Sequence, residues 1–169
     1  MKHPKTLTLG SSAIALIGLS ALIQANPVLV WNASASVPIG FYGVQPLDAP
    51  AVGDLVVLEP PSPLSDWILE RGYLGADVPL LKHVAALPGQ RVCRIGVIVT
   101  VDGSLVATAK IRDRFDRPLP SWQGCQTLTT TQIFFLNPDT EASLDGRYFG
   151  PLPRDTIHGR AVPIWTREG

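Results

Sequence analysis

The chain has 169 residues, enough for one domain with a single hydrophobic core and a short appendage. Its 14 basic and 14 acidic residues give a net charge of zero and are spread along the sequence, so no basic stripe is available to bind nucleic acid. An apolar share of 46% excludes a disordered chain, and 15 glycines and 16 prolines without any period favour a turn-rich β protein over collagen.

The first predicted element is an apolar segment near the N-terminus. No charged residue occurs from Leu7 to Trp31, and about 20 apolar residues suffice for a helix to cross a bilayer. Lys2 and Lys5 precede this segment, and positive charge favours the cytoplasmic side of a membrane. We therefore expect a single-pass anchor in the inner (cytoplasmic) membrane. The alternatives are a cleaved signal peptide ending at Ala25 and a buried soluble helix.

This orientation divides the chain into residues 1–31, the anchor or signal-like segment, and residues 32–169, a periplasmic domain. Cys93 and Cys125 allow one intramolecular pairing, and an even number of cysteines in an oxidising compartment usually forms disulfides. Two buried thiols are the alternative. Neither cysteine has metal-site spacing and the three histidines are scattered, so we expect no metal and no other cofactor.

Short strands separated by turns dominate the rest of the sequence. Residues 62–75 are the exception, because Ser62 can cap a helix, Pro63 suits its first turn and Gly72 can end it. Residues 112–126 mix charge, proline and tryptophan, which predicts a surface excursion. The expected strands lie within residues 41–47, 53–61, 78–92, 92–111 (a hairpin around Asp102-Gly103), 131–139 and 158–165. The pattern predicts a mainly β fold, a closed or nearly closed antiparallel β domain.

A turn of small residues follows the apolar segment directly. The stretch "WNASASVPIGFYGV", residues 31–44, carries Ser34 and Ser36 without any charged residue. A loop serine is usually an ordinary turn residue. A nucleophile is the rarer alternative, and the stretch by itself does not decide between the two.

Lys82 has an unusual setting. No other Lys, Arg, Asp or Glu occurs between residues 77 and 91. On a strand, Lys82 would share a largely apolar face with Leu80 and Val84, and burial lowers the pKa of a lysine towards neutrality, as a general base requires. The alternative is an edge-strand lysine that reaches water. His83 would point to the opposite face, and no Ser-His-Asp spacing supports it as a base.

A third segment, "SLDGRYFGP", places Ser143, Asp145 and Arg147 at alternating positions. An aspartate two residues from an arginine most often forms a local ion pair. The serine hydroxyl two residues earlier could orient an amine.

These segments together resemble the signal peptidase I family of serine-lysine peptidases, and more narrowly its conjugal branch, the TraF-type plasmid-transfer peptidases. The motifs "SASVPIGFY", "LLKHVAALPG" and "SLDGRYFGPLPRDTIHGRAVPIW" occur in the family's order behind an apolar segment. The turn Ser-Val-Pro replaces the family's Ser-Met-x-Pro, and "LNPDTEAS" replaces its Gly-Asp-Asn-Arg box. The short turn favours the conjugal branch over the housekeeping enzyme.

The resemblance implies specific roles for the serine turn and the lysine. Ser36 matches the nucleophile, and Lys82 matches the general base that takes its proton and later protonates the leaving amine. Ser34 matches the residue whose hydroxyl forms the oxyanion hole together with the backbone N–H of Ser36.

The resemblance also implies a supporting group. Ser143 matches the hydroxyl that orients the lysine, and Asp145 matches the family's acidic residue, with Arg147 as its ion-pair partner. Peptide substrates of the family present small residues next to the cut and lie along the enzyme as an added strand.

The function implied is that of a membrane-anchored serine endopeptidase processing an exported precursor. The expected substrate is a conjugative pilin for type IV secretion, cleaved or cyclised. The alternatives are a general type I signal peptidase and a non-enzymatic anchored β scaffold of a transfer complex. A self-cleaving repressor is opposed by the apolar segment and by the lack of a helix-turn-helix pattern.

Overall fold

The computed structural model describes residues 29–75 and 78–167. The predicted anchor or signal segment falls almost entirely on residues 1–28 and lies outside the described residues. Among the described residues, no helix is long and apolar enough to span a membrane.

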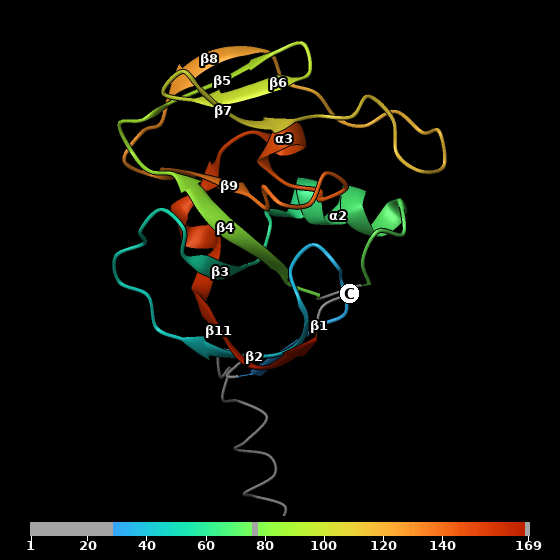
Figure 1. Cartoon of the computed structure of the whole chain (residues 1–169), viewed down its shortest axis with the longest axis vertical. Helices are drawn as coiled ribbons and strands as arrows, with labels where there is room; N and C mark the ends of the chain where they lie inside the picture. The colour runs from blue at the N-terminus through green and yellow to red at the C-terminus, as the bar shows by residue number, and fades with distance from the viewer. Residues whose placement is uncertain (1–28, 76–77, 168–169) are drawn as a thin grey trace, which may run out of the picture.

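Two antiparallel sheets hold most of the regular secondary structure of the described residues, as predicted for a mainly β fold (Figure 1). The larger sheet has seven strands in the order β1-β2-β11-β3-β4-β9-β10. Its strands are β1 (Leu29–Asn32), β2 (Ile39–Gln45), β3 (Leu55–Leu58), β4 (Leu80–Ala86), β9 (Gln132–Leu136), β10 (Leu152–Pro153) and β11 (Ile157–Arg167). β4 therefore lies inside the sheet, with β3 on one side and β9 on the other.

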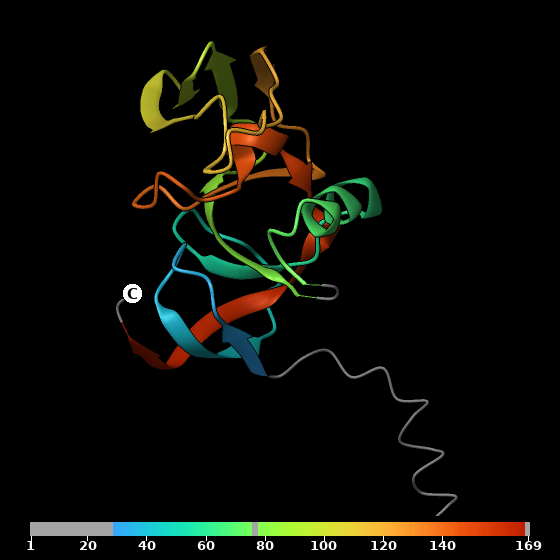
Figure 2. The ribbon, with the colours of Figure 1, turned by 90° about the vertical axis from the view of Figure 1, so that its right-hand side faces the viewer.

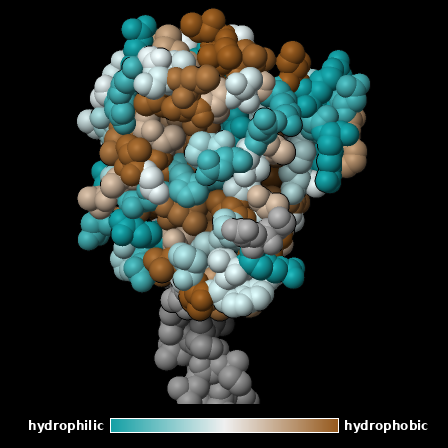
Figure 3. All heavy atoms as spheres, viewed as in Figure 1, coloured by the Kyte–Doolittle hydropathy of each residue, from teal (hydrophilic) through white to brown (hydrophobic). Residues whose placement is uncertain are grey.

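The smaller sheet has four strands in the order β7-β6-β5-β8 and lies at one end of the molecule (Figures 1 and 2). Its strands are β5 (Arg91–Ile95), β6 (Ile98–Val101), β7 (Ser104–Thr108) and β8 (Gly124–Thr127). Exposed apolar side chains, including Ile95, Ile98 and Leu105, gather at this end (Figure 3). The predicted hairpin turn joins β6 to β7, with Asp102 and Gly103 both at positive φ.

The helices are short. They are α2 (Ser62–Glu70), α3 (Gly146–Phe149) and the 3-10 helix η1 (Arg154–Thr156). α2 confirms the helix predicted within residues 62–75, but the prediction that Ser62 caps it was wrong. Pro61 takes the N-cap position and no side chain caps the helix, because Ser62 is already its first residue.

Two further boundaries differ from the sequence-based expectation. Trp31 belongs to β1 and pairs with Phe41 on β2, so the sheet begins two residues before Trp31. Residues 112–126 were expected to be a continuous excursion, but β8 begins at Gly124 and pairs with β5. All four residues of β8 are exposed, so the strand has no alternating apolar pattern to reveal it.

Packing against α2 and against the loop between β1 and β2 positions the centre of the larger sheet. Val56, Leu80 and Val84 on β3 and β4 pack with Ile68 of α2 in one buried cluster. Val37, Tyr42 and Leu81 pack in another, which brings the end of the β1–β2 loop against β4. Buried apolar area of this kind contributes about 25 cal/mol per Å² to stability.

Candidate active site

The loop between β1 and β2, residues 33–38, carries both serines and is called the serine loop below. Asn32 is buried at its start. Its Nδ2 donates to the carbonyl oxygens of Ser34 (2.8 Å), Val37 (3.1 Å) and Pro38 (3.1 Å), and its Oδ1 accepts from the Ser34 N–H at 3.1 Å. The Tyr42 hydroxyl donates to the Pro38 oxygen at 2.6 Å. Buried polar groups satisfied in this way hold a loop in one conformation.

Gly40 allows the other end of the serine loop to enter the sheet. A Cβ atom at this position would lie 2.0 Å from the Trp165 carbonyl oxygen of β11. Only glycine permits this approach of two backbones, so the loop starts and ends at fixed points.

Within the loop, the two serines bond to each other. Ser34 Oγ donates to Ser36 Oγ at 3.0 Å and accepts from the Ser36 N–H at 3.3 Å. The two groups expected to form an oxyanion hole, the Ser34 hydroxyl and the Ser36 N–H, are therefore adjacent. In this conformation they are hydrogen-bonded to each other. Thr140 Oγ1 donates to the Ser36 carbonyl oxygen at 3.3 Å and ties the serine loop to the segment after β9.

Lys82 lies inside the protein on β4, with 3% of its surface exposed. Because β4 is an inner strand, the alternative of an edge lysine that reaches water is wrong. The Lys82 ammonium donates to Ser143 Oγ at 3.0 Å. Burial lowers the pKa of Lys82 from its ordinary 10.5 to about 8, the Asp145 carboxylate opposes the fall, and the charge of Arg147 adds to it. A substantial share of the amine is therefore neutral near physiological pH.

The residues that hold Ser143 against the lysine centre on a buried ion pair. Arg147 Nη2 and Asp145 Oδ2 are 2.9 Å apart, and both side chains are almost fully buried. Asp145 Oδ1 also accepts from the backbone N–H and Nε of Arg147, and its Oδ2 accepts from the Asn137 N–H at 3.0 Å. Asp145 thus caps α3 and fixes the end of β9 at once.

Arg147 also orders the loop from residue 137 to residue 145. Its Nη2 donates to the carbonyl oxygens of Asn137 and Thr140, both at 2.7 Å. The Ser143 N–H in turn donates to the Thr140 oxygen at 3.1 Å. Gly146 permits this arrangement, since a Cβ atom there would lie 2.5 Å from the Phe134 ring. The buried guanidinium of Arg147 therefore fixes the position of Ser143 through the loop that it orders.

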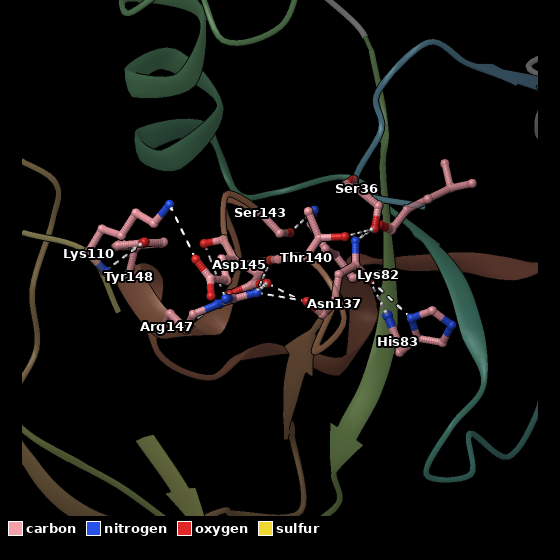
Figure 4. A network of polar contacts seen from close by, with 12 residues as sticks. Ser36, Lys82, His83, Lys110, Asn137, Thr140, Ser143, Asp145, Arg147 and Tyr148 are labelled. Atoms are coloured by element: carbon pink, nitrogen blue, oxygen red, sulfur yellow. Dashed lines mark hydrogen bonds and ion pairs between the residues drawn. The ribbon is translucent and has the colours of Figure 1, made fainter. Parts of the chain in front are cut away.

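A pocket of about 300 Å³ lies beside Ser36. It is lined by the serine loop from Ala35 to Pro38, by His83, and by the segment from Asn137 to Thr140. Lys82 does not line it, and among the described residues no hydrogen bond joins Ser36 to Lys82. Figure 4 shows Ser36, Lys82 and His83 on one side of the polar network and Arg147 on the other, with the 137–145 loop between them.

Three residues of this network were not predicted. Asn32 and Asn137 act through side-chain amides, and Asn137 Oδ1 contacts His83 Nδ1 at 3.1 Å while its Nδ2 donates to the Leu81 oxygen at 3.0 Å. Thr140 donates a hydrogen bond to the carbonyl oxygen of Ser36, which lies 104 positions earlier in the sequence. The position of Asn32 just before the serines was the one local signal available, since asparagine commonly bonds to nearby backbone in turns.

The two cysteines lie away from this network, on the smaller sheet. Cys93 on β5 and Cys125 on β8 are directly opposite each other and are joined by a disulfide. Within residues 29–75 and 78–167, no three His, Cys, Asp or Glu side chains gather as metal ligands would.

The site thus combines a buried amine of lowered pKa, a hydroxyl bonded to that amine, and a serine in a stiff turn beside a pocket, which are the groups of a serine hydrolase. Residues 5–166 match the family described as signal peptidase, peptidase S26, and the chain belongs to this family. The resemblance inferred from the sequence motifs is confirmed.

Similar proteins include members named for conjugation. The chain is 35% identical to a probable conjugal transfer protein TraF of Sinorhizobium fredii, over 96% of this chain and 90% of the relative. It is 31% identical to a conjugal transfer protein TraF of Agrobacterium tumefaciens, over 98% of both. Among solved structures, a signal peptidase I of Enterococcus faecalis aligns at 17% identity with a TM-score of 0.39, over 68% of this chain and 97% of that one.

Proposed function

We propose that this protein is a membrane-anchored serine endopeptidase in which Ser36 and Lys82 act as a catalytic dyad. The observation that carries the proposal is the setting of Lys82, a buried amine with a pKa of about 8 and a hydrogen bond to Ser143. A buried charge is unfavourable for folding, so a lysine at this position calls for a role other than stability.

In the first step, the Ser36 hydroxyl turns from Ser34 towards the neutral amine of Lys82. Ser36 Oγ attacks the carbonyl carbon of the scissile bond while its proton passes to Lys82 Nζ. The C–N bond then breaks, Lys82 gives the proton that it took from Ser36 to the leaving amine, and the substrate acyl group remains as an ester on Ser36.

In the second step, a water or a substrate amine attacks the ester carbonyl and gives its proton to Lys82. The bond to Ser36 Oγ breaks, and the serine recovers that proton. Water yields a cut peptide, whereas the substrate's own amino terminus yields a ring.

Stabilisation of the developing oxyanion falls to the Ser34 hydroxyl and the Ser36 N–H. These groups are bonded to each other at 3.3 Å, so a substrate carbonyl oxygen would replace one hydrogen bond as it arrives. Donors of this kind contribute about 10²–10³ in rate each.

We further propose that the catalytic domain lies in the periplasm at the surface of the inner membrane. Residues 7–28, which precede β1 and carry no charge, support an anchor. Exposed aromatic side chains on the first strands and on β11, namely Trp31, Phe41 and Trp165, suit the interface where aromatic residues concentrate. The disulfide between Cys93 and Cys125 suits an oxidising compartment.

The proposed substrate is the precursor of a conjugative pilin, maturing for type IV secretion. Its support is the full-length similarity to relatives named conjugal transfer protein TraF.

The test is mass spectrometry of a candidate pilin precursor co-expressed with the full-length protein. We expect processing with the native protein and none with Ser36→Ala or Lys82→Ala. Lys110→Ala is the matched control, because Lys110 is half exposed and lies outside the pocket. A product one water lighter than the linear peptide would show ring closure. Equal processing by all variants would refute the dyad, and an unreactive Ser36 towards an acylating inhibitor would then favour the scaffold alternative.

A further inference from the structure

The pocket beside Ser36 has an uneven charge. Its lining includes one carboxylate, Asp139, and one histidine, His83, whose Nδ1 contacts Asn137 Oδ1, but neither lysine nor arginine. Asp139 is exposed, and among the ion pairs found within the described residues none involves it. It directly precedes Thr140, which bonds to the Ser36 carbonyl oxygen. An unpaired negative charge therefore lies next to the proposed nucleophile.

The pocket is also larger than a small side chain needs. Its volume of about 300 Å³ would be filled only in part by the methyl group of an alanine. Val37, Pro38 and Pro138 supply apolar lining, and Asp139 in the same lining is exposed to solvent. This combination suits an aliphatic stem that ends in a cation, since lysine and arginine bury their methylene groups and keep the charge at the surface.

We propose that this pocket binds a positively charged substrate side chain close to the scissile bond, and that Asp139 is the residue that selects it. Because Ser36 itself lines the pocket, the charged residue lies within about two positions of the cut. The inference rests on the proposed peptidase function and adds a second element of specificity to the expected small residue at the cut.

The test measures binding separately from cleavage. Full-length Ser36→Ala protein in an uncharged detergent is titrated with fluorescent alanine-based peptides that differ at one central residue, which is lysine, norleucine or glutamate. We expect the lysine peptide to bind about two- to fivefold more tightly than the norleucine peptide, the effect of a partly exposed charge pair. The glutamate peptide should bind most weakly, and added salt should reduce the differences.

Asp139→Asn in the same protein should bring the lysine and norleucine peptides to equal affinity, and Asp139→Lys should reverse the order of lysine and glutamate. Asp66→Asn is the matched control, because Asp66 is exposed on α2 and does not line this pocket. Equal affinity for the three peptides, or a lysine preference that survives Asp139→Asn, would overturn the inference.

Failure of the inference and failure of the proposed function give different results. Pilin processing that requires Ser36, with no charge preference in binding, overturns only the role of Asp139. A charge preference that depends on Asp139, with processing that ignores Ser36, overturns the dyad and leaves the pocket's selectivity supported.

Discussion

Replacing Lys82 with methionine tests whether the amine is held in an unfavourable setting. Burial lowers its pKa from 10.5 to about 8, a fall that corresponds to about 3 kcal/mol in the free energy of unfolding. Methionine has a similar length and no charge. The hydrogen bond to Ser143 is lost at the same time, which offsets about 1 kcal/mol. We therefore expect Lys82→Met to abolish processing and to raise the free energy of unfolding at neutral pH by about 2 kcal/mol.

The size of this gain should depend on pH. Below pH 8 the lysine is protonated in both the folded and the unfolded chain, so its full destabilising effect is present. Between pH 8 and 10.5 the unfolded chain binds more protons than the folded chain, and raising the pH therefore stabilises the native protein. From neutral pH to about pH 10, the difference between Lys82→Met and the native protein should shrink by about 2 kcal/mol.

The assay is urea unfolding of the full-length proteins in an uncharged detergent, followed by tryptophan fluorescence at several pH values. Lys110→Met is the control, because Lys110 is half exposed and its contact with Glu141 is 3.7 Å long. Its effect should stay below about 1 kcal/mol. A difference for Lys82→Met that is flat across the same pH range would mean that Lys82 titrates as an ordinary lysine, and the argument for a general base would fail.

Three further predictions concern the same network. The rate of peptide cleavage should rise with pH to half its maximum at about pH 8, because the neutral amine of Lys82 is the base, and a rate independent of pH would contradict this. Thr140→Val removes the bond to the Ser36 oxygen and should lower kcat about tenfold, whereas Thr140→Ser should keep most of it; equal rates in the two variants would exclude a positioning role. Arg147→Met leaves Asp145 buried without its partner and should lower the free energy of unfolding by about 3–5 kcal/mol in a urea titration, and adding Asp145→Asn should restore part of the loss.

The sequence predicted the parts of the site that depend on local pattern. Lys82 stood out as an isolated charge in an apolar strand, and the structure buries it. The alternation of Asp145 and Arg147 predicted a local ion pair, which is present and almost fully buried. Ser34 and Ser36 were expected in a stiff turn, and they occupy a loop held by six polar contacts to Asn32, Tyr42 and Thr140.

Other features had no local signal. The contact between Thr140 and Ser36 joins residues 104 positions apart, so neither segment alone could reveal it. β8 lacks an alternating pattern because each of its residues is exposed. The cap predicted at Ser62 was wrong because Ser62 is the first residue of α2. The N-cap position falls to Pro61, which has an extended backbone and makes no side-chain capping bond.

The sequence by itself determined that the chain is rich in short strands, that it carries three motifs of one peptidase family, and that a single lysine interrupts an apolar strand. Only the tertiary structure decided what that lysine is. The alternation of apolar residues is the same for an edge strand and an inner strand. The pKa of a lysine amine differs between the two, because only the inner strand removes the amine from water. The pairing of β4 with both β3 and β9 places Lys82 away from water, and that long-range pairing, which no short segment encodes, gives the amine a pKa of about 8.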